Sequence, residues 1–310
     1  MCGLSGCIHN NKYFLDLEKF KKINDLLKSR GPNNQNVIEI PKDDKKIKLG
    51  HTRLSIQDLN SNANQPMYTK DKKLVILFNG EIYNHLKLRK LPTLKHIIWE
   101  TTSDTETLII LFEIFGVSKT INLLEGMFAI VLYDRNKNII FHIRDKSGEK
   151  PLYIGLNNNF FSFASDPIVF MKLPHFDKAI SKKALSNYLK FNYIPNPHTI
   201  FSNSFKIPPA SILEINLNKF SFVEGITFEN FIKNTGVKLY KWWNLDTNKI
   251  FLNNNQFSYS DAKKFTQKLL INSVNKQQIS DVPIGVFLSG GIDSSLITAL
   301  ISKNQSNIKT

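Results

Sequence analysis

Apolar side chains spaced three and four residues apart predict helices in the first two thirds of the chain, with approximate bounds 17–27, 104–115 and 182–190. The first stops at Arg30-Gly31-Pro32, a sequence that ends helices. The second opens with a capping box, in which Ser103 is the cap and Glu106 lies three residues further on, and it stops before Gly116. Ser181 opens the third helix.

Short runs rich in β-branched and aromatic residues predict strands at 73–78, 127–133, 139–143 and 160–164. The polar residues 134–138 between the second and third runs have the composition of a hairpin turn. The first half of the chain is therefore expected to be rich in β-sheet. On a strand, Cys7 would lie on the face opposite to Cys2, where a role as a buried apolar filler suits it best.

The pattern changes after residue 193. Residues 193–209 are rich in Pro and Asn, and residues 217–255 are polar and irregular, so we expect a connection between domains here. Beyond it, Ser260 caps a helix to about Lys276, residues 283–288 resemble a short buried strand, and helical spacing returns at Ile292. One strand and one helix cannot cover both faces of a parallel sheet. We therefore expect a first domain at 2–215, a connection at 216–255 and an incomplete domain at 256–310.

Composition narrows the class of protein. The chain has 310 residues, of which 42% are hydrophobic, which is enough for a sizeable core and about two domains. Its apolar runs fall far short of the roughly 20 residues that span a bilayer, so we expect no membrane association. Only two cysteines occur and the N-terminus lacks the features of a secretory signal, which excludes a disulfide scaffold and favours a cytoplasmic location.

The net charge of +15 could attract nucleic acid. The lysines, however, lie in short groups such as 42–48 and 70–73, interleaved with Asp and placed beside turn residues. Solvated loops explain this distribution, so we expect no nucleic-acid partner. The histidines show no metal-ligand spacing, and we expect core or loop roles for His9, His51, His85 and His142.

The N-terminus carries the first candidate chemistry. Removal of the initiator methionine would leave Cys2 with its thiol and a free α-amine in the same residue. An α-amine titrates near ~7.7 to 8 and a thiol near ~8.5, so the amine can accept the thiol proton directly or through a water. Attack on an amide carbonyl becomes feasible without a histidine. An ordinary small residue at position 2 is the alternative.

Downstream residues supply what a glutamine site needs. Arg53 can clamp a carboxylate with two hydrogen bonds. Asn79-Gly80-Glu81 follows a predicted strand and provides an amide, a closely approachable backbone N–H and a carboxylate. Asp104 lies at a predicted helix start. Each could be an ordinary surface or cap residue, but together they would provide donors for a tetrahedral intermediate, a cation for an α-carboxylate and anions for an α-ammonium.

The sequence resembles the glutamine-hydrolysing asparagine synthetases over about its first 210 residues. The resemblance rests on Met1-Cys2-Gly3-Leu4-Ser5-Gly6, Arg30-Gly31-Pro32, His51-Thr52-Arg53-Leu54-Ser55-Ile56, Gln65-Pro66, Asn79-Gly80-Glu81-Ile82-Tyr83-Asn84, Ser103-Asp104-Thr105-Glu106, Gly126-Met127-Phe128-Ala129, Arg144-Asp145 and Gly148-Glu149-Lys150-Pro151-Leu152-Tyr153. Amidotransferases that deliver ammonia to sugars or to phosphoribosyl pyrophosphate share part of this pattern.

The resemblance implies an α+β fold, an N-terminal nucleophile hydrolase in which two antiparallel sheets lie between helices. It implies that Cys2 is the nucleophile and that Asn79 and the Gly80 N–H form the oxyanion hole. It further implies a class II glutamine amidotransferase whose glutamine-binding residues are Arg53, Leu54, Ile56, Asn79, Gly80, Glu81 and Asp104.

A second motif lies near the C-terminus. Residues 288–295, Leu288-Ser289-Gly290-Gly291-Ile292-Asp293-Ser294-Ser295, join a predicted strand to a predicted helix, so backbone N–H groups and a helix N-terminus can cradle an anion. The S-G-G-x-D-S-S pattern resembles the pyrophosphate loop of ATP pyrophosphatases, whose domain is α/β. This implies that ATP is bound by these residues, with Asp293 available to Mg²⁺.

In the family, ATP activates the β-carboxylate of aspartate and ammonia from glutamine displaces AMP. Members of the family continue beyond the position of Thr310 with further strands and substrate-binding groups, so we expect the synthetase half to be incomplete in this chain. A homodimer, or a separate polypeptide that supplies the remainder, are the expected assemblies. Two alternatives stay open, a truncated remnant without catalysis and an amidotransferase for a different carboxylate.

Overall fold

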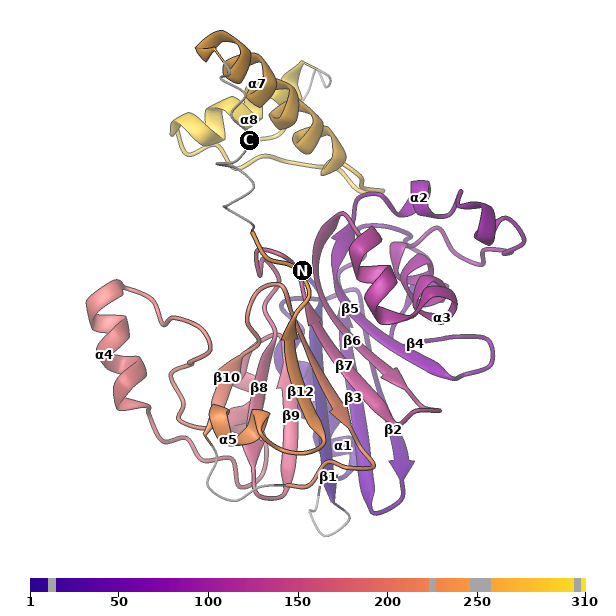
Figure 1. Cartoon of the computed structure of the whole chain (residues 1–310), viewed down its shortest axis with the longest axis vertical. Helices are drawn as coiled ribbons and strands as arrows, with labels where there is room; N and C mark the ends of the chain where they lie inside the picture. The colour runs from indigo at the N-terminus through magenta and orange to yellow at the C-terminus, as the bar shows by residue number, and fades with distance from the viewer. Residues whose placement is uncertain (11–14, 223–226, 246–257, 304–307) are drawn as a thin grey trace. The chain divides into compact units, whose positions relative to one another are not determined.

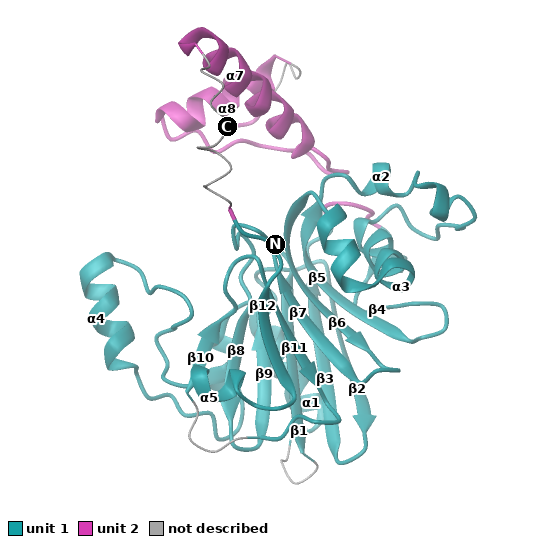
Figure 2. Ribbon diagram, in the orientation of Figure 1, with its two compact units in different colours: residues 1–55, 60–244 teal, residues 56–59, 245–310 magenta. Residues whose placement is uncertain are grey.

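The computed structural model describes residues 1–10, 15–222, 227–245, 258–303 and 308–310. These residues form two compact units (Figures 1 and 2). The first contains Met1–Ser55 and Asn60–Asn244, and the second contains Ile56–Leu59 and Leu245–Thr310.

Two antiparallel six-stranded sheets make up the first unit. The first sheet has the order β10-β8-β9-β1-β3-β2, with bounds Ser204–Lys206, Tyr153–Asn157, Phe160–Ala164, Gly3–Asn10, Lys45–Arg53 and Asn34–Lys42. The second has the order β12-β11-β7-β6-β5-β4, with bounds Val237–Lys241, Ser211–Asn216, Ile139–Arg144, Gly126–Asp134, Leu74–Ile82 and Met67–Tyr68.

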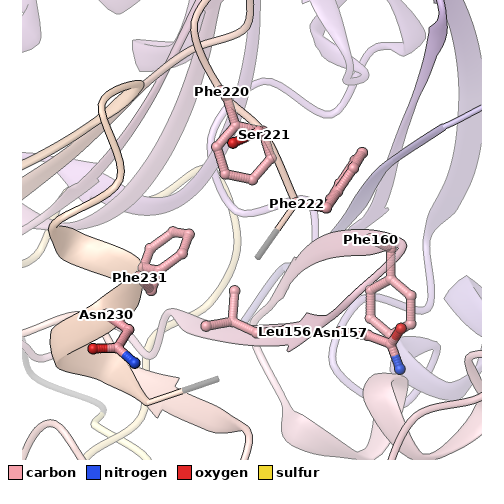
Figure 3. A pocket seen from close by; sticks show the side chains of 8 residues that line it. All are labelled: Leu156, Asn157, Phe160, Phe220, Ser221, Phe222, Asn230 and Phe231. Carbon is pink, nitrogen blue, oxygen red and sulfur yellow. The ribbon is translucent and has the colours of Figure 1, made fainter. Parts of the chain in front are cut away.

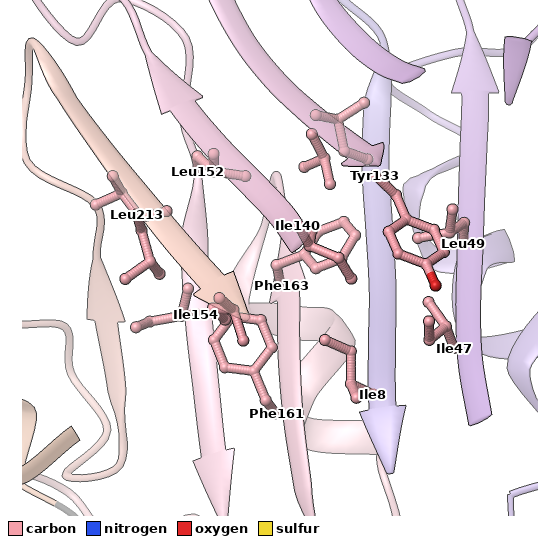
Figure 4. Close-up of a cluster of buried hydrophobic side chains, with 14 of the residues drawn as sticks. Ile8, Ile47, Leu49, Tyr133, Ile140, Leu152, Ile154, Phe161, Phe163 and Leu213 are labelled. Atoms are coloured by element: carbon pink, nitrogen blue, oxygen red, sulfur yellow. The ribbon is translucent and has the colours of Figure 1, made fainter. Parts of the chain in front are cut away.

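Alternate residues of each strand lie in different apolar clusters, and this places the sheets face to face. In β5, Val75 and Leu77 join a cluster that also holds Leu4 and Ile8 of β1, whereas Ile76 joins a different one. The shared cluster is the core between the sheets, and Figure 4 shows side chains from both sheets meeting in it. Successive side chains point to opposite faces of a strand, so each sheet must also be covered on its outer face.

Helices provide these outer layers. The 3-10 segments η1 (Asp25–Leu27) and η4 (Pro167–Lys172) pack with helix α1 (Leu17–Asn24) against the outer face of the first sheet, in the cluster that contains Cys7. Helices α2 (His85–Leu88) and α3 (Asp104–Leu123) pack against the second sheet with the short η3 (Pro92–Leu94). The layers are helix, sheet, sheet and helix, as expected for an N-terminal nucleophile hydrolase. Burial on both faces explains why the strands appear as continuous apolar runs.

Most predicted elements are present, with changes at their ends. The helices at 17–27 and 182–190 are confirmed, the latter as α4 (Lys182–Phe191) with the Ser181 side chain accepting from the Ala184 N–H. Strand β5 is longer than predicted and contains Asn79-Gly80-Glu81 instead of ending before them. The helix predicted at 104–115 is also confirmed, because helical geometry breaks at Gly116, whose φ is 72°; beyond this kink α3 continues as a second helical stretch to Leu123. The hairpin at 134–138 is confirmed.

The segment expected to be irregular contains regular structure. Helix α5 (Phe228–Ile232) lies in it, and β12 pairs with β11 from Ser211 opposite Lys241 to Ile215 opposite Val237. The first unit consequently extends to Asn244. Part of the predicted connection, residues 246–257, lies outside the described residues.

The second unit contains two helices, α7 (Tyr259–Lys276) and α8 (Ile292–Ser302). Ser258, and not Ser260, caps α7 by accepting from the Asp261 N–H. The predicted strand at 283–288 is wrong for the described residues, where only a single bridge joins Gly285 to Lys309 and Phe287 is 99% exposed. A strand needs a neighbour to pair with, and none is described beside it. In the part of the chain that the structure describes, no helix is long and apolar enough to cross a membrane.

Candidate functional site

The thiol of Cys2 lies at one end of the space between the sheets. Leu4 and Ile8 of β1 point into the inter-sheet core, and the same alternation continued backwards places Cys2 on that face. Its Sγ accepts a hydrogen bond from the Leu54 N–H at 3.4 Å, and its carbonyl oxygen accepts one from Arg30 Nε at 3.2 Å. Cys7 points the other way and is fully buried in the outer cluster, as predicted.

Arg53 lies beside this thiol because β3 pairs with β1. The register sets Gly3 opposite Thr52, so Arg53 falls level with Cys2. Ile47 and Leu49 of β3 point into the core between the sheets, and Arg53 follows in the same alternation. The side chain is buried, with Nη1 donating to the Asn60 carbonyl at 2.7 Å and to Asn64 Oδ1 at 2.8 Å. A guanidinium held in this way is a preorganised site for a carboxylate.

Strand β5 brings an amide to the same end of the core. Val75 and Leu77 face the space between the sheets, so Asn79 and Glu81 face it as well. Asn79 is 1% exposed, and its Nδ2 has no hydrogen-bond partner among the described residues. A buried donor without a partner costs about 1–3 kcal/mol, so the site contains a hydrogen-bond donor that an incoming oxygen atom would satisfy.

The backbone of β5 offers a second donor. The N–H groups of Phe78, Gly80 and Ile82 point to one edge of the strand because they are two residues apart. Phe78 donates to Gln65 Oε1 at 2.6 Å, and Ile82 donates to Asp104 Oδ2 at 2.9 Å. The Gly80 N–H lies on the edge between these two bonds. A Cβ at this position would lie 2.2 Å from a carbonyl oxygen of β6, so only glycine fits.

Two acidic side chains lie close together on this edge. Asp104 begins α3 after the Ser103 cap and is 5% exposed. Burial, and secondly the negative charge of Glu81, raise the pKa of the Asp104 carboxyl. Hydrogen bonds from backbone N–H groups oppose that rise without cancelling it. Since ionised carboxylates repel each other here, the pocket favours a bound cation such as an ammonium group.

The charges around the thiol suit proton transfer to an amine. Burial raises the pKa of the Cys2 thiol, while the Leu54 N–H and the positive chain terminus lower it. Burial also lowers the pKa of the terminal amine, which is carried by Met1 in this chain. Both groups are therefore biased towards their neutral forms, S–H and NH₂, and a neutral amine can accept a proton.

Two residues near the site were not predicted as site residues. Gln65, 3% exposed, reaches the strand that carries Asn79. Lys150 is also buried; burial lowers the pKa of its ammonium, and attraction to Glu81 and Cys2 opposes that shift. Both lie in segments that carried the family resemblance, but neither residue type by itself indicates a role in hydrolysis.

Of the predicted glutamine-binding residues, the first unit holds Arg53, Leu54, Asn79, Gly80, Glu81 and Asp104. Ile56 belongs to the segment Ile56–Leu59, which is counted with the second unit, where its carbonyl accepts from the Asp281 N–H at 2.9 Å.

The second predicted motif opens α8. Gly290 has a φ of 81°, and Gly291 caps the helix without a side-chain hydrogen bond, so the first N–H groups of α8 keep no side-chain cap. Ser289 Oγ lies 3.1 Å from Ser294 Oγ. Leu288, Ile292, Asp293 and Ser295 are exposed. Among the described residues, no group of three metal-ligating side chains occurs. Asp293 is an acidic residue in the first turn of α8.

A separate hollow lies where β8 turns into β9 (Figure 3). Its lining includes Leu156, Phe160, Phe220 and Phe231. It has a cavity volume of about 10 Å³, room for about one water molecule. Phe160 pairs with His9 near the end of β1, whereas Cys2 precedes its start, so this hollow is remote from the thiol.

Comparisons with known proteins identify the family of the chain. Residues 1–225 match the family model described as a glutamine amidotransferase domain, and residues 266–310 match that of asparagine synthase. The chain belongs to the glutamine amidotransferase domain family.

Its relatives include two Bacillus subtilis proteins. The chain is 32% identical to asparagine synthetase [glutamine-hydrolyzing] 1, covering 100% of this chain and 45% of the relative. It is 30% identical to asparagine synthetase [glutamine-hydrolyzing] 3, covering 97% and 45%. The chain thus spans about half the length of the curated relatives it matches.

A solved structure supports the fold. The glutamine phosphoribosylpyrophosphate amidotransferase from B. subtilis matches with a TM-score of 0.53 and 16% identity, over 78% of this chain and 49% of the other. At this identity the likeness bears on the fold alone, which is that of an N-terminal nucleophile hydrolase.

Proposed function

We propose that this chain hydrolyses glutamine to glutamate and ammonia as the glutaminase part of an asparagine synthetase. The observation that carries the proposal is the buried Asn79 Nδ2 without a partner, on the same face and at the same end of the core as Cys2. A buried donor without a partner is costly, and an oxygen atom of a bound ligand would remove that cost. The amide oxygen of glutamine, negative in the tetrahedral intermediate, is such a ligand.

In the proposed reaction, loss of Met1 leaves the α-amine on Cys2. The amine takes the thiol proton while sulfur forms a bond to the side-chain carbonyl carbon of glutamine. Asn79 Nδ2 and the Gly80 N–H donate to the oxygen that becomes negative. The protonated amine then gives its proton to the leaving nitrogen, and ammonia departs. Water hydrolyses the resulting thioester to glutamate and restores the thiol.

Substrate binding is assigned to the surrounding charges. Arg53 holds the α-carboxylate of glutamine, and Glu81 with Asp104 holds its α-ammonium. The N–H of Leu54 keeps the sulfur in place, and Ile56 lies two residues beyond it on the same loop. The buried charge of Lys150 would partly offset Glu81 near the nucleophile.

The ammonia would serve ATP-dependent amidation of aspartate. Residues 288–295 would bind the pyrophosphate portion of ATP at the start of α8, with Asp293 as a ligand of Mg²⁺. Mg²⁺ would supply positive charge against the phosphates. The remaining synthetase groups would have to come from further chain or from a partner polypeptide, since about half of the relatives' length is covered here.

The direct test measures glutamate and ammonia formed from glutamine by the wild-type chain and by the Cys2→Ala variant. Equal amounts of the two products from the wild type, and none from the variant, are expected. Retained activity in Cys2→Ala would contradict the assignment. A folded wild-type chain without turnover would favour a non-catalytic remnant.

A further inference from the structure

Strand β4 ends its pairing with β5 just before the proposed oxyanion donors. It contains only Met67–Tyr68, with Met67 opposite Ile76. If the register continued, residue 65 would lie opposite Phe78 and residue 63 opposite Gly80. Residues Ser61–Ala63 instead form the 3-10 turn η2. No described strand therefore covers the edge of β5 where the Gly80 N–H lies.

The side chain of Gln65 takes the place of the missing strand. It is 3% exposed, and its Oε1 accepts from the Phe78 N–H at 2.6 Å, where a strand carbonyl would otherwise do so. Its Nε2 donates to Thr105 Oγ1 at 3.2 Å. Phe78 directly precedes Asn79, and Thr105 directly follows Asp104. One amide therefore links the strand that bears the oxyanion donors to the helix that bears a carboxylate of the ammonium site.

We propose that Gln65 is a positioning residue for glutamine hydrolysis. Its two hydrogen bonds fix Asn79 and Gly80 relative to Asp104. Because its side chain, and not a strand carbonyl, accepts from the Phe78 N–H, the pairing of β4 with β5 can end before Gly80. The Gly80 N–H then stays open to substrate. This inference rests on the proposed function. It adds a residue that touches neither glutamine nor the reacting atoms but sets the distance between the two halves of the site.

The two ends of the Gln65 amide predict different kinetic effects. Gln65→Met keeps the size of the side chain and removes both hydrogen bonds, so kcat should fall roughly 10²-fold through misplacement of the oxyanion donors. Thr105→Val removes only the bond near Asp104, so KM for glutamine should rise about tenfold while kcat stays nearly constant. Gln65→Glu keeps the acceptor for Phe78 and should retain more kcat than Gln65→Met.

A transition-state mimic separates positioning from stability. Glutamate γ-semialdehyde forms a hemithioacetal with the thiol and needs the same donors, so its dissociation constant should rise in Gln65→Met in parallel with the loss of kcat. Thr120→Val is the matched control, since it deletes another buried hydroxyl that donates to the Leu111 carbonyl at 2.9 Å. It should lower the melting temperature without changing kcat or KM.

Wild-type kcat and aldehyde affinity in Gln65→Met would overturn the inference. The inference would also be overturned if Gln65→Met lost no more kcat and aldehyde affinity than Thr120→Val, when the two variants are equally destabilised. If Gln65→Met does not fold, Gln65→Glu and Thr105→Val decide, and unchanged kinetics in both would refute it. A wild-type chain that releases no ammonia would instead defeat the proposed function, which is a distinguishable result.

Discussion

Replacing Asn79 by leucine should lower activity strongly without loss of stability. An ordinary buried amide is hydrogen-bonded, and deleting it leaves a partner unsatisfied. Asn79 differs because its Nδ2 has no partner among the described residues, although the side chain is only 1% exposed. Leucine has nearly the same shape and no donor. The free energy of unfolding should therefore stay constant or rise by up to about 1–3 kcal/mol, the cost of a buried unsatisfied group.

The same substitution should lower kcat. Loss of one donor to a developing oxyanion lowers kcat by about 10²–10³, or roughly 2.7–4 kcal/mol of transition-state stabilisation. KM for glutamine should change little, because Arg53 and the acidic pair hold the rest of the substrate.

The assay for Asn79→Leu combines denaturant unfolding with steady-state release of glutamate. Asn24→Leu is the control, since Asn24 is a buried asparagine whose Nδ2 is also unpartnered but whose Oδ1 accepts from Ser5. It should lose stability and keep kcat. A strongly destabilised Asn79→Leu variant, or one with wild-type kcat, would refute the reasoning.

Three further predictions concern charge and space. Because burial and Glu81 raise the pKa of Asp104, binding of glutamine at pH 7 to the Cys2→Ala variant should release a proton. Calorimetry in buffers of different ionisation enthalpy measures this release, and it should detect no released proton when Asp104 is also changed to Asn. Burial lowers the pKa of His142 to about 3, so below about pH 6.5 the unfolded chain binds a proton at this residue that the native state does not bind. Between pH 6.5 and 5 this removes about 1.6 kcal/mol of stability, and denaturant titrations of His142→Leu should show a loss smaller than that of the wild type by this amount. Gly80→Ala should abolish turnover and lower the melting temperature, because the methyl group would lie 2.2 Å from a carbonyl oxygen of β6; full activity would contradict the assignment of this strand edge.

The sequence predicted elements whose signals are local. Helix α1 follows from the spacing of Phe20 and Ile23, both buried against the first sheet. Strand β3 was missed because lysines interrupt its apolar pattern, and one of them, Lys48, is fully buried beside Glu39 on the neighbouring strand. The two residues lie nine positions apart across the hairpin that joins β2 to β3, so periodicity along β3 alone does not reveal the pair.

The candidate site was only partly predictable, because its motifs are local signals and its geometry depends on strand pairing. The motifs identified residue types, but only the register of β1 against β3 sets Arg53 level with Cys2. The role of Gln65 depends on where β4 ends its pairing, which no spacing encodes. The strand predicted at 283–288 failed because an apolar run becomes a strand only beside a partner, and no partner strand is described there.

The central claim concerns the thiol of Cys2. The full chain should be incubated with the electrophilic glutamine mimic 6-diazo-5-oxo-L-norleucine, with and without excess glutamine, and mapped by mass spectrometry. The account predicts one adduct, on Cys2 as the N-terminal residue of a chain that has lost Met1, with protection by glutamine. An unlabelled Cys2, or an adduct on Cys7 alone, would contradict it.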